Sequence, residues 1–600
     1  MQQIVTDIVI VGGGGAGLRA AIAAAEAAPG LSITVLSKVY PMRSHTVAAE
    51  GGAAAVTLSS DSTAAHFEDT VSGGDWLADQ PVVEFFVKQA YRELVQLEHW
   101  GCPWSRRQDG NVTVRRFGGM KTERTWFAAD KTGFHILHTL FQTSLKYPAI
   151  KRLDEFFVLD LLRQGDQVVG IIALALNSGE LVQVQAKSVI FATGGAGRVF
   201  HYNTNGGIVT GDGMALAYRH GVQLRDMEFV QYHPTGLPGS GILITEACRG
   251  EGAVLLNKHG KRYLQDYGLG PETPLGQPKN KQMELGPRDK LSQAFWHELQ
   301  AGRCGDYNGH AVVYLDLRHI SRAHLLQRLP FICELAKAYV NIDPAMSAIP
   351  IRPAVHYTMG GIATDINCQT TLPGLYAVGE CASVGLHGAN RLGSNSLSEL
   401  LVFGRVAGEQ AARYASQCLP VDSKALSVQR EMSQRWLNRR FGTNASDSVA
   451  KLRQDMTLAM EQGCGIYRTG QGLQHCQQQL QALQQRYQQL KVTDRSKVFN
   501  VELVQYLELG FSLDVAQAIC SAAMARTESR GAHQRLDEGM TARNDAEFLC
   551  HSQLSYRANS LPQLSWQAVK ISSLPPAQRS YSSDNATADN SADRAQGAQP

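Results

Sequence analysis

Short apolar runs alternate with Gly-rich turns in the first 200 residues, which predicts an open α/β sheet. Residues 7–11 (DIVIV) and 32–36 (SITVL) are apolar enough to be buried strands. The Ala-rich segment 18–28 between them has high helix propensity, so the three form a βαβ unit. Two further strand patterns, 188–192 (SVIFA) and 374–380 (GLYAVGE), also end in turns. Strands that end in such turns are spread over 380 residues, which predicts a single domain interrupted by insertions.

The hydrophobic pattern changes to a helical period after about residue 415. Apolar or small residues follow a 3-4-3-4-3 spacing at Leu473, Cys476, Leu480, Leu483, Tyr487 and Leu490. This spacing predicts an amphipathic helix in a bundle, despite the many Gln residues between them. Residues 582–600 contain no bulky apolar side chain and are rich in Asn, Asp, Ser and Ala, so we expect a disordered tail.

Composition places the chain among large globular proteins. Its 600 residues are about four times the ~150 residues of a typical domain, and 44% are hydrophobic. These values exclude disorder of the whole chain. Charges interrupt every apolar stretch before the ~20 residues of a membrane span. The net charge of +3, from 57 basic and 54 acidic residues, is too balanced for a dedicated nucleic-acid binder.

The eleven cysteines restrict the redox chemistry. No two are closer than twelve residues, which excludes zinc knuckles, C-x-x-C-H haem attachment and ferredoxin-like runs, and we predict no metal site. The N-terminal sequence enters a strand without a basic region, so we expect no secretory signal and a reducing, cytoplasmic setting. Any redox carrier must then be a bound organic cofactor.

The segment between the first strand and helix is Gly12-Gly13-Gly14-Gly15-Ala16-Gly17, with G-x-G-x-x-G spacing at 12, 14 and 17. In such loops the first Gly allows a tight turn, the second admits a pyrophosphate and the third permits close helix–strand packing. The helix N-terminus then faces the phosphates with free amides. Ser37-Lys38 stand where NAD-binding units have an acidic residue, so we expect a flavin dinucleotide rather than NAD.

Arg, His and Thr recur in Gly-rich loops and indicate a second site. The loops are residues 43–52, 233–236, 245–251, 286–289, 352–361 and 387–397. Each alone is typical of a surface salt bridge or a capped turn. Together they predict a pocket for a small dianion, because the forked guanidinium group binds carboxylates bidentately.

These loops resemble the flavoprotein subunits of fumarate reductase and succinate dehydrogenase. The similarity spans residues 1 to about 575 and includes SKVYPMRSHT from 37, HPTG from 233, TEACRGEG from 245, HYTMGG from 356, HGANRLGSNSL from 387 and ARTESRGAH from 525. It implies FAD joined covalently through its 8α-methyl group to His45. It also implies FAD contacts from Gly12, Gly13, Gly14, Gly15, Ala16, Gly17, Leu36, Ser37, Lys38, Ser44, Thr46, Ala49, Glu50, Gly51, Gly52, Phe156, Phe157, Val158, Thr193, Gly194, Asp212, His356, Tyr357, Glu380, Arg391, Ser394, Asn395, Ser396 and Leu397.

The same resemblance assigns the chemistry. It implies that His233, Thr245, His356 and Arg391 hold the two substrate carboxylates and polarise the alkene toward hydride from flavin N5. It further implies that Arg288 protonates the other carbon and that Glu246 and Arg249 return the proton. An arginine has a pKa above ~12, so its proton must move together with hydride arrival at a carbanion-like centre.

Two features favour the fumarate reductase branch over succinate dehydrogenase. Glu50 stands in AEGG where bacterial succinate dehydrogenases resemble AQGG, and residues 100–107 and 283–289 also look like fumarate reductase. The alternatives are succinate dehydrogenase, L-aspartate oxidase, against which His45 argues, and a binding module with a vestigial site. The absence of C-x-x-C-H excludes a haem-fused fumarate reductase.

The last expectations concern the partner subunits and the domain organisation of the chain. The sequence has no cluster motif of its own, and the resemblance implies an iron–sulfur subunit over the FAD domain and membrane-anchor subunits that oxidise menaquinol. It also implies that the chain is peripheral on the cytoplasmic face of the bacterial inner membrane. We expect an α/β fold whose Rossmann-like FAD-binding domain is split by an α+β capping domain, followed by a helical and a small C-terminal domain. The predicted boundaries are 1–240 and 354–415 for the two FAD-binding parts, 241–353 for the cap, 416–535 for the helical domain, 536–577 for the C-terminal domain and 578–600 for the tail.

Overall fold

A five-stranded parallel sheet forms the centre of the protein. The computed structural model describes residues 2–418, 426–443 and 447–579. The sheet has the order β19 (Leu375–Ala377), β11 (Ser188–Phe191), β2 (Ile8–Val11), β3 (Ile33–Ser37) and β7 (Ile150–Asp154). All four predicted strands are therefore confirmed as members of one sheet, with ends shifted by a few residues. The predicted helix 18–28 is α1 (Gly15–Ala27).

Both faces of this sheet are covered, which explains why its strands are continuously apolar. Ile8 and Ile10 of β2 join one hydrophobic core, whereas Val9 and Val11 join another. Helices cover the first face: α1, α2 (Thr63–Gly73), α3 (Gln80–His99), α4 (Thr132–Ser144) and α10 (Asn395–Gln417). The second face packs on α5 (Asp212–Arg219) and a four-stranded sheet of order β1 (Gln2–Val5), β10 (Glu180–Gln185), β9 (Gln167–Ala175) and β8 (Phe156–Gln164).

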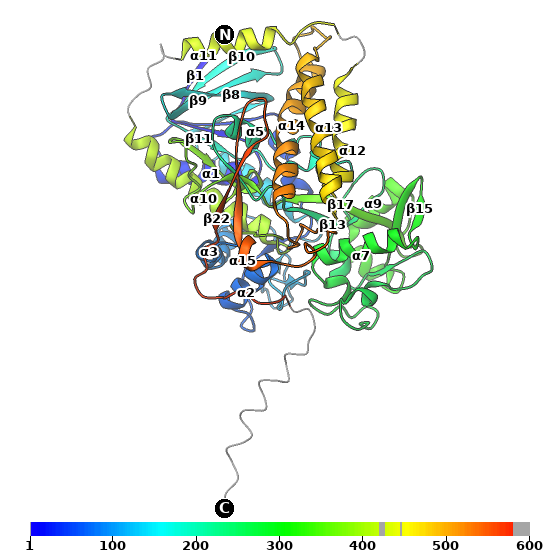
Figure 1. Ribbon diagram of the computed structural model, residues 1–600. Coiled ribbons are helices and arrows are strands. Elements are labelled where there is room, and N and C mark those ends of the chain that lie inside the picture. The colour runs from blue at the N-terminus through cyan, green and yellow to red at the C-terminus, as the bar shows by residue number, and fades with distance from the viewer. Residues whose placement is uncertain (1, 419–425, 444–446, 580–600) are drawn as a thin grey trace, which may run out of the picture.

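The inserted cap has a core of its own, which runs from Leu237 to Ile351. It contains α6 (Ala247–Gly250), α7 (Arg288–Gln300), α8 (Arg322–Arg328), α9 (Pro330–Val340), β14 (Val254–Leu256), β15 (Gly305–Tyr307) and β16 (His310–Asp316). Its sheet continues into β17 (Ile349–Thr358) and β13 (Val230–Gly236), which pair antiparallel. The predicted boundary at 353 falls inside β17, so one strand belongs to both the cap and the FAD-binding part. The cap stands to one side of the molecule in Figure 1.

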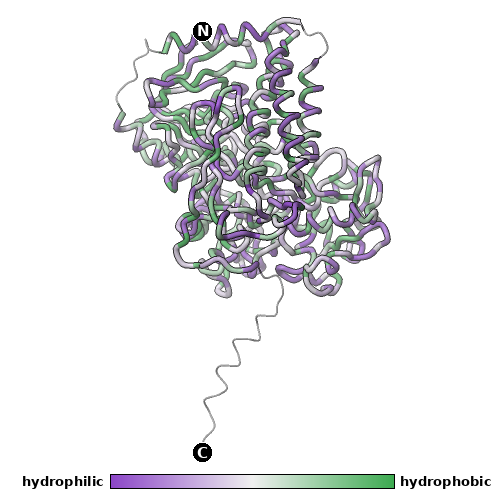
Figure 2. The backbone as a smooth tube through the Cα atoms, in the orientation of Figure 1, coloured by the Kyte–Doolittle hydropathy of each residue, from purple (hydrophilic) through white to green (hydrophobic). Residues whose placement is uncertain are grey.

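A helical bundle flanks the second core. Its helices are α11 (Ser427–Asn438), α12 (Val449–Gly463), α13 (Gly470–Gln489) and α14 (Val501–Ala525), and the last three lie side by side in Figure 1. The amphipathic helix predicted around 473–490 is confirmed as α13. Figure 2 shows hydrophobic and hydrophilic positions alternating along these helices. Helix α14 is long and apolar enough to cross a membrane, but 89% of its most apolar window is buried in the protein, as expected of a core helix.

The C-terminal part is joined to the FAD-binding part through a sheet. This part also contains the short helix α15 (Asp545–Phe548). In the FAD-binding part, a separate three-stranded sheet has the order β4 (Ala53–Ala54), β6 (Thr125–Trp126) and β5 (Val114–Arg115). The joining sheet has the order β20 (Ala382–Ser383), β18 (Gly361–Ala363), β12 (Leu224–Arg225), β21 (Cys550–Ser555) and β22 (Gln563–Ala568).

Residues 578 and 579, at the start of the predicted tail, are among the described residues. Arg579 forms an ion pair of 2.7 Å with Asp289 of the cap and donates a hydrogen bond to the Gly73 carbonyl. Residues 580–600, the rest of the predicted tail, lie outside the described residues.

Candidate active site

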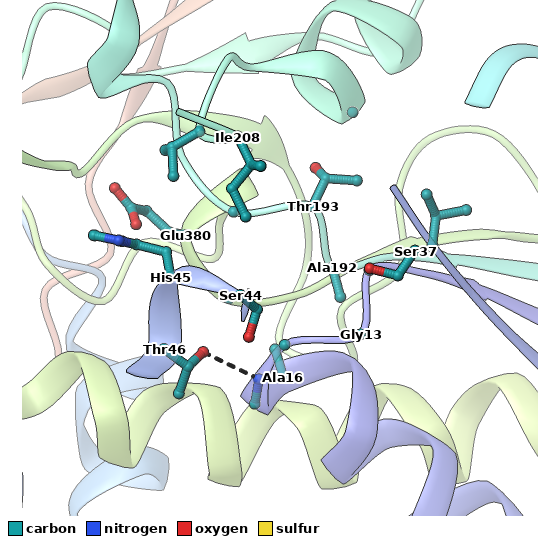
Figure 3. A pocket seen from close by; sticks show the side chains of 18 of the residues that line it. Gly13, Ala16, Ser37, Ser44, His45, Thr46, Ala192, Thr193, Ile208 and Glu380 are labelled. Atoms are coloured by element: carbon teal, nitrogen blue, oxygen red, sulfur yellow. Dashed lines mark hydrogen bonds between the residues drawn. The ribbon is translucent and has the colours of Figure 1, made fainter. Parts of the chain in front are cut away.

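An elongated cavity opens at the carboxyl ends of the central strands, as expected for a nucleotide site in an α/β fold. In Figure 3, His45 and Glu380 lie toward one end and Ser37 toward the other. The cavity is lined by these residues predicted from the sequence: Gly12, Gly13, Gly14, Gly15, Ala16, Leu36, Ser37, Lys38, Ser44, His45, Thr46, Ala49, Phe156, Phe157, Val158, Thr193, Gly194, Asp212, His356, Tyr357, Glu380, Ser396 and Leu397. Four separate stretches of the chain therefore meet at one site.

The glycine loop has the geometry that its spacing predicts. Gly12 has φ of 119°, and a Cβ added there would lie 2.1 Å from the Ala192 carbonyl oxygen. A Cβ on Gly17 would lie 1.9 Å from the Gly12 carbonyl oxygen, so close helix–strand packing requires glycine. A Cβ on Gly14 meets only side chains at 3.4 Å or more. Among these three glycines, Gly14 is the one that internal packing does not require, so its backbone is open to the approach of a ligand.

The start of α1 is suited to phosphate. Gly14 is its N-cap and offers no side-chain acceptor, so the first amides are open to a ligand, apart from the Gly15 N–H, which donates to Thr46 Oγ1 at 3.1 Å. The buried Ser44 Oγ has no hydrogen-bond partner among the described residues. Orphaned donors beside a Gly-rich helix start fit a dinucleotide, and these residues would hold its pyrophosphate.

Lys38 does not present an unpaired charge at the end of β3. Its Nζ contacts Asp212 Oδ2 at 2.7 Å, Glu508 Oε1 at 2.9 Å and Thr210 Oγ1 at 2.9 Å. Burial alone would lower the pKa of Lys38, but the two carboxylates outweigh it and raise the pKa. Lys38 therefore ties the cavity wall to α5 and α14.

His45 is neutral and accessible from the cavity. Desolvation lowers its pKa to about 4. The Gly206 N–H donates to its Nδ1 at 3.4 Å, and Asn205 Nδ2 lies 3.4 Å from its Nε2. Glu380 is also desolvated, which raises its pKa to about 7, although it accepts a hydrogen bond from the Thr358 N–H.

Seven residues predicted to contact the cofactor do not line this cavity: Gly17, Glu50, Gly51, Gly52, Arg391, Ser394 and Asn395. Two of them, Ser394 and Asn395, contact other buried residues instead. Asn395 contacts His66 Nε2 at 2.9 Å, and the Ser394 Oγ accepts from Thr125 Oγ1 at 3.0 Å. Glu50 is buried, and desolvation together with Asp130 raises its pKa well above the usual value.

The sequence reasoning missed part of the lining. The missed residues are Val11, Val39, Ala48, Ala192, Ile208, Val209, Gly213, Leu216, Val378, Gly379 and Leu400. Helical spacing could have found two of them, because Leu216 lies four residues after Asp212 on α5 and Leu400 lies four after Ser396 on α10.

The residues predicted to bind a dianion come together where the cap meets the FAD-binding part. His233 lies on β13, His356 on β17 and Arg288 at the start of α7. Thr245, Glu246 and Arg249 lie in and before α6, and Arg391 lies in the loop before α10. His356 also lines the cofactor cavity, whereas Arg288 and Arg391 line a neighbouring cavity with Gly118 and Gly393.

Glu246 is the centre of an ion-pair chain. Arg288 approaches Glu246 Oε2 through both Nε and Nη2 at 2.8 Å, and Arg249 Nη2 lies 3.4 Å from the same oxygen. The Gly118 N–H donates to its other oxygen. Burial alone would raise the pKa of Glu246, but Arg249 and Arg288 outweigh it and lower the pKa.

Gln231 connects the two arginines and was missed. Its Oε1 accepts from Arg288 Nη1 at 3.1 Å and from Arg391 Nη2 at 3.2 Å, and its Nε2 donates to the Arg391 carbonyl at 2.8 Å. Gln231 stands two residues before His233 on the same strand. The period of two in a strand was the available signal.

The two histidines are neutral donors. Their rings lie 5.0 Å apart, and burial with the nearby Arg288 lowers both pKa values well below the usual value. His233 Nδ1 lies 3.1 Å from Thr235 Oγ1 and 3.3 Å from the Thr235 amide nitrogen, and these contacts fix the ring. Thr204 Oγ1 lies 2.8 Å from His356 Nδ1 and fixes that ring.

The cluster has the charge that a dicarboxylate requires. Arg249, Arg288 and Arg391 set against Glu246 leave a formal charge of +2. Burial and repulsion from Arg288 lower the pKa of Arg391 to about 10, and Arg391 stacks on Tyr357 at 4.3 Å. An anion that neutralised this site would relieve that repulsion.

Comparisons with known proteins agree with this geometry. Residues 7–397 match the family model described as "FAD binding domain", and residues 453–581 match "Fumarate reductase flavoprotein C-term". The "Fumarate reductase flavoprotein subunit" of Serratia sp. is 62% identical over 97% of both chains, and that of Escherichia coli is 60% identical over 100% of both. The chain belongs to the fumarate reductase flavoprotein family.

Solved structures place it in the same branch of this family. The flavoprotein of an E. coli quinol fumarate reductase mutant has a TM-score of 0.95 at 61% identity, covering 96% of this chain and 99% of that one. The "Succinate dehydrogenase flavoprotein subunit" of Rickettsia bellii is 40% identical over 96% of this chain and 98% of its own length. The predicted fold class, family and fumarate reductase branch are confirmed, as is an FAD-binding domain.

Proposed function

We propose that this chain is the catalytic subunit of a membrane-associated quinol:fumarate reductase that reduces fumarate to succinate in anaerobic respiration. The observation that supports this is the buried +2 cluster beside the cofactor cavity, because fumarate is a dianion at neutral pH. Reduced FAD, when bound, supplies a hydride. The protein must then bind the dianion, polarise its double bond and deliver one proton.

The substrate carboxylates are held by neutral and charged donors. Arg391 provides a guanidinium group that Gln231 and Ser396 fix, the latter through a 2.7 Å hydrogen bond from Arg391 Nη1. His233, His356 and Thr245 complete the set. Donors concentrated on one carboxylate withdraw electron density from the nearer alkene carbon and make it electrophilic.

Arg288 delivers the proton. Its two contacts with Glu246 keep the guanidinium aligned. The lowered pKa of Glu246 keeps that carboxylate ionised, so that it can take up a proton and pass it to Arg288. Arg249 forms the next link. Proton donation from so weak an acid requires concerted hydride arrival, because a carbanion-like centre is a far stronger base than water.

Steady-state assays of the purified complex test the function. We expect one succinate per menaquinol analogue oxidised, with fumarate reduction faster than succinate oxidation and no oxygen-dependent oxidation of L-aspartate. Faster succinate oxidation would favour a succinate dehydrogenase, and L-aspartate oxidation would favour the oxidase alternative.

We also propose that FAD is attached covalently to His45. The neutral imidazole exposes a nucleophilic nitrogen to the cavity, because its pKa is lowered to about 4. A denaturing gel viewed under ultraviolet light should show protein-bound flavin fluorescence in the native chain and none in His45→Ser. Fluorescence that persists in His45→Ser places the link elsewhere.

The electrons come from partner subunits. One similar solved structure is named "Quinol-Fumarate Reductase with Menaquinol Molecules", with a TM-score of 0.94 at 61% identity over 96% of this chain and all of that one. Since this sequence has no clustered cysteine motif, we propose an iron–sulfur subunit over the FAD domain and membrane anchors that hold the chain at the cytoplasmic face of the inner membrane. The isolated chain should reduce fumarate with a reduced dye but not with menaquinol. Menaquinol activity of the isolated chain would contradict this.

A further inference from the structure

Three cysteines far apart in the sequence meet inside the helical bundle. Cys464 follows α12, Cys476 lies on α13 and Cys520 lies on α14, the three helices that stand side by side in Figure 1. Their Sγ atoms all lie within 4.8 Å of one another, and all three side chains are buried. All three are free thiols.

The packing around the thiols keeps them close. A Cβ on Gly463 would lie 2.4 Å from Cys476 Cβ, so α12 and α13 approach this closely only because residue 463 is glycine. Met460 adds a fourth sulfur, since its Sδ lies 3.9 Å from Cys476 Sγ. No imidazole or carboxylate joins the group within the described ranges.

A buried cation compensates the charge that thiolates would bring. Arg468 is 1% exposed, and its Nη2 has no hydrogen-bond partner among the described residues. Arg468 lies near Cys464 and acts electrostatically on its sulfur.

We propose that Cys464, Cys476 and Cys520 form a buried three-coordinate site for Cu(I). An ion in the plane of three sulfurs, with bonds of about 2.3 Å, holds them about 4.0 Å apart. That spacing is consistent with sulfurs that all lie within 4.8 Å of one another. Soft thiolate and thioether ligands select Cu(I), whereas structural Zn(II) requires four ligands of the Cys or His type.

Binding involves no electron transfer. Cu(I) enters, up to three Cu–S bonds form, and the displaced thiol protons go to solvent, so affinity rises with pH. Because the three sulfurs come from three helices, the ion cross-links the bundle. A ligand bound only by the folded state raises the midpoint of thermal unfolding.

Competition for Cu(I) tests the site in the purified full chain under anaerobic conditions. With one equivalent of Cu(I) and bathocuproine disulfonate as competitor, we expect about one copper per chain and a higher unfolding temperature. Cys476→Ser should weaken copper retention by about 10- to 100-fold or more. Cys102→Ser, which removes an isolated buried thiol, should leave retention unchanged.

Four results would overturn the proposal. They are no copper retained against the chelator, retention that is unchanged in Cys476→Ser, retention of Zn(II) in place of Cu(I), or a disulfide between two of the three cysteines in the native chain. If Cys476→Ser fails to fold, X-ray absorption of the copper-loaded native chain decides. Three sulfur neighbours are predicted, and nitrogen or oxygen neighbours would contradict the site.

Discussion

Gln231 shows how a neutral residue sets the geometry of a charged site. One amide oxygen accepts from both Arg288 and Arg391, so it separates two guanidinium groups that would otherwise repel. Burial, together with the positive charge of the nearby arginines, lowers the pKa values of His233 and His356. The substrate therefore meets donors in fixed orientations. The histidines among them are neutral, and the arginines are charged.

The Gln231→Leu variant tests this role. It keeps the side-chain volume but removes the shared acceptor, and a lost hydrogen bond to a charged group costs about 1.5–3 kcal/mol, or about 10- to 150-fold. We expect kcat/KM for fumarate to fall by that factor with flavin content unchanged. Gln183→Leu, a buried Gln on β10, is the matched control. Equal losses in both variants would show that Gln231 has no special role.

At the scale of elements, the β21–β22 hairpin is tied to the FAD-binding part by a buried charge. His551 of β21 contacts Asp226 Oδ2 at 2.6 Å and Asp79 Oδ1 at 3.4 Å. Burial alone would lower the pKa of His551, but the Asp226 and Asp79 carboxylates outweigh it and raise the pKa to about 9. The protonated imidazole is thus part of the folded structure at neutral pH.

This pairing predicts a pH-dependent stability. The folded pKa exceeds the unfolded value of about 6.5, so the contribution is full below pH ~6.5 and is lost as pH rises through ~9. It amounts to about 3 kcal/mol at most. Thermal unfolding should show a midpoint that falls between these pH values, and His551→Gln should flatten that fall. An unchanged slope in His551→Gln would refute the assignment.

At the scale of the whole molecule, the site forms only where the cap and the FAD-binding part meet. Arg579 of the C-terminal segment joins the two, since it pairs with Asp289 of the cap and donates to the Gly73 carbonyl of α2. Asp289 follows Arg288 directly. The C-terminal segment therefore helps to hold the cap, and with it the acid, over the substrate.

Arg579→Ala should raise KM for fumarate more than it lowers kcat. Breaking a buried ion pair leaves Asp289 uncompensated and weakens the cap's attachment. Steady-state kinetics at several fumarate concentrations measure the effect, and Arg557→Ala is an exposed control in the same C-terminal part. A fall in kcat alone would place the effect in chemistry rather than in cap attachment.

Local patterns predicted the strands, the glycine loop and α13, because each depends on periodicity or on the conformation of single residues. The resemblance in the loops supplied the dianion residues. What sequence reasoning missed depends on tertiary contacts. Gln231 matters only because β13 faces two arginines. The wide spacing of the cysteines excludes short-spaced cluster motifs, but it does not show that Cys464, Cys476 and Cys520 meet, because it does not show which helices lie side by side.

Single-turnover reduction of fumarate by Arg288→Lys tests the role of Arg288 as the acid most directly. Lysine keeps the charge but cannot keep both guanidinium contacts with Glu246, so the proton is no longer delivered in line with hydride. We predict a loss of at least about 100-fold in rate, with protein-bound flavin and fumarate affinity close to native. Near-native turnover in Arg288→Lys would contradict the role of Arg288 as the acid.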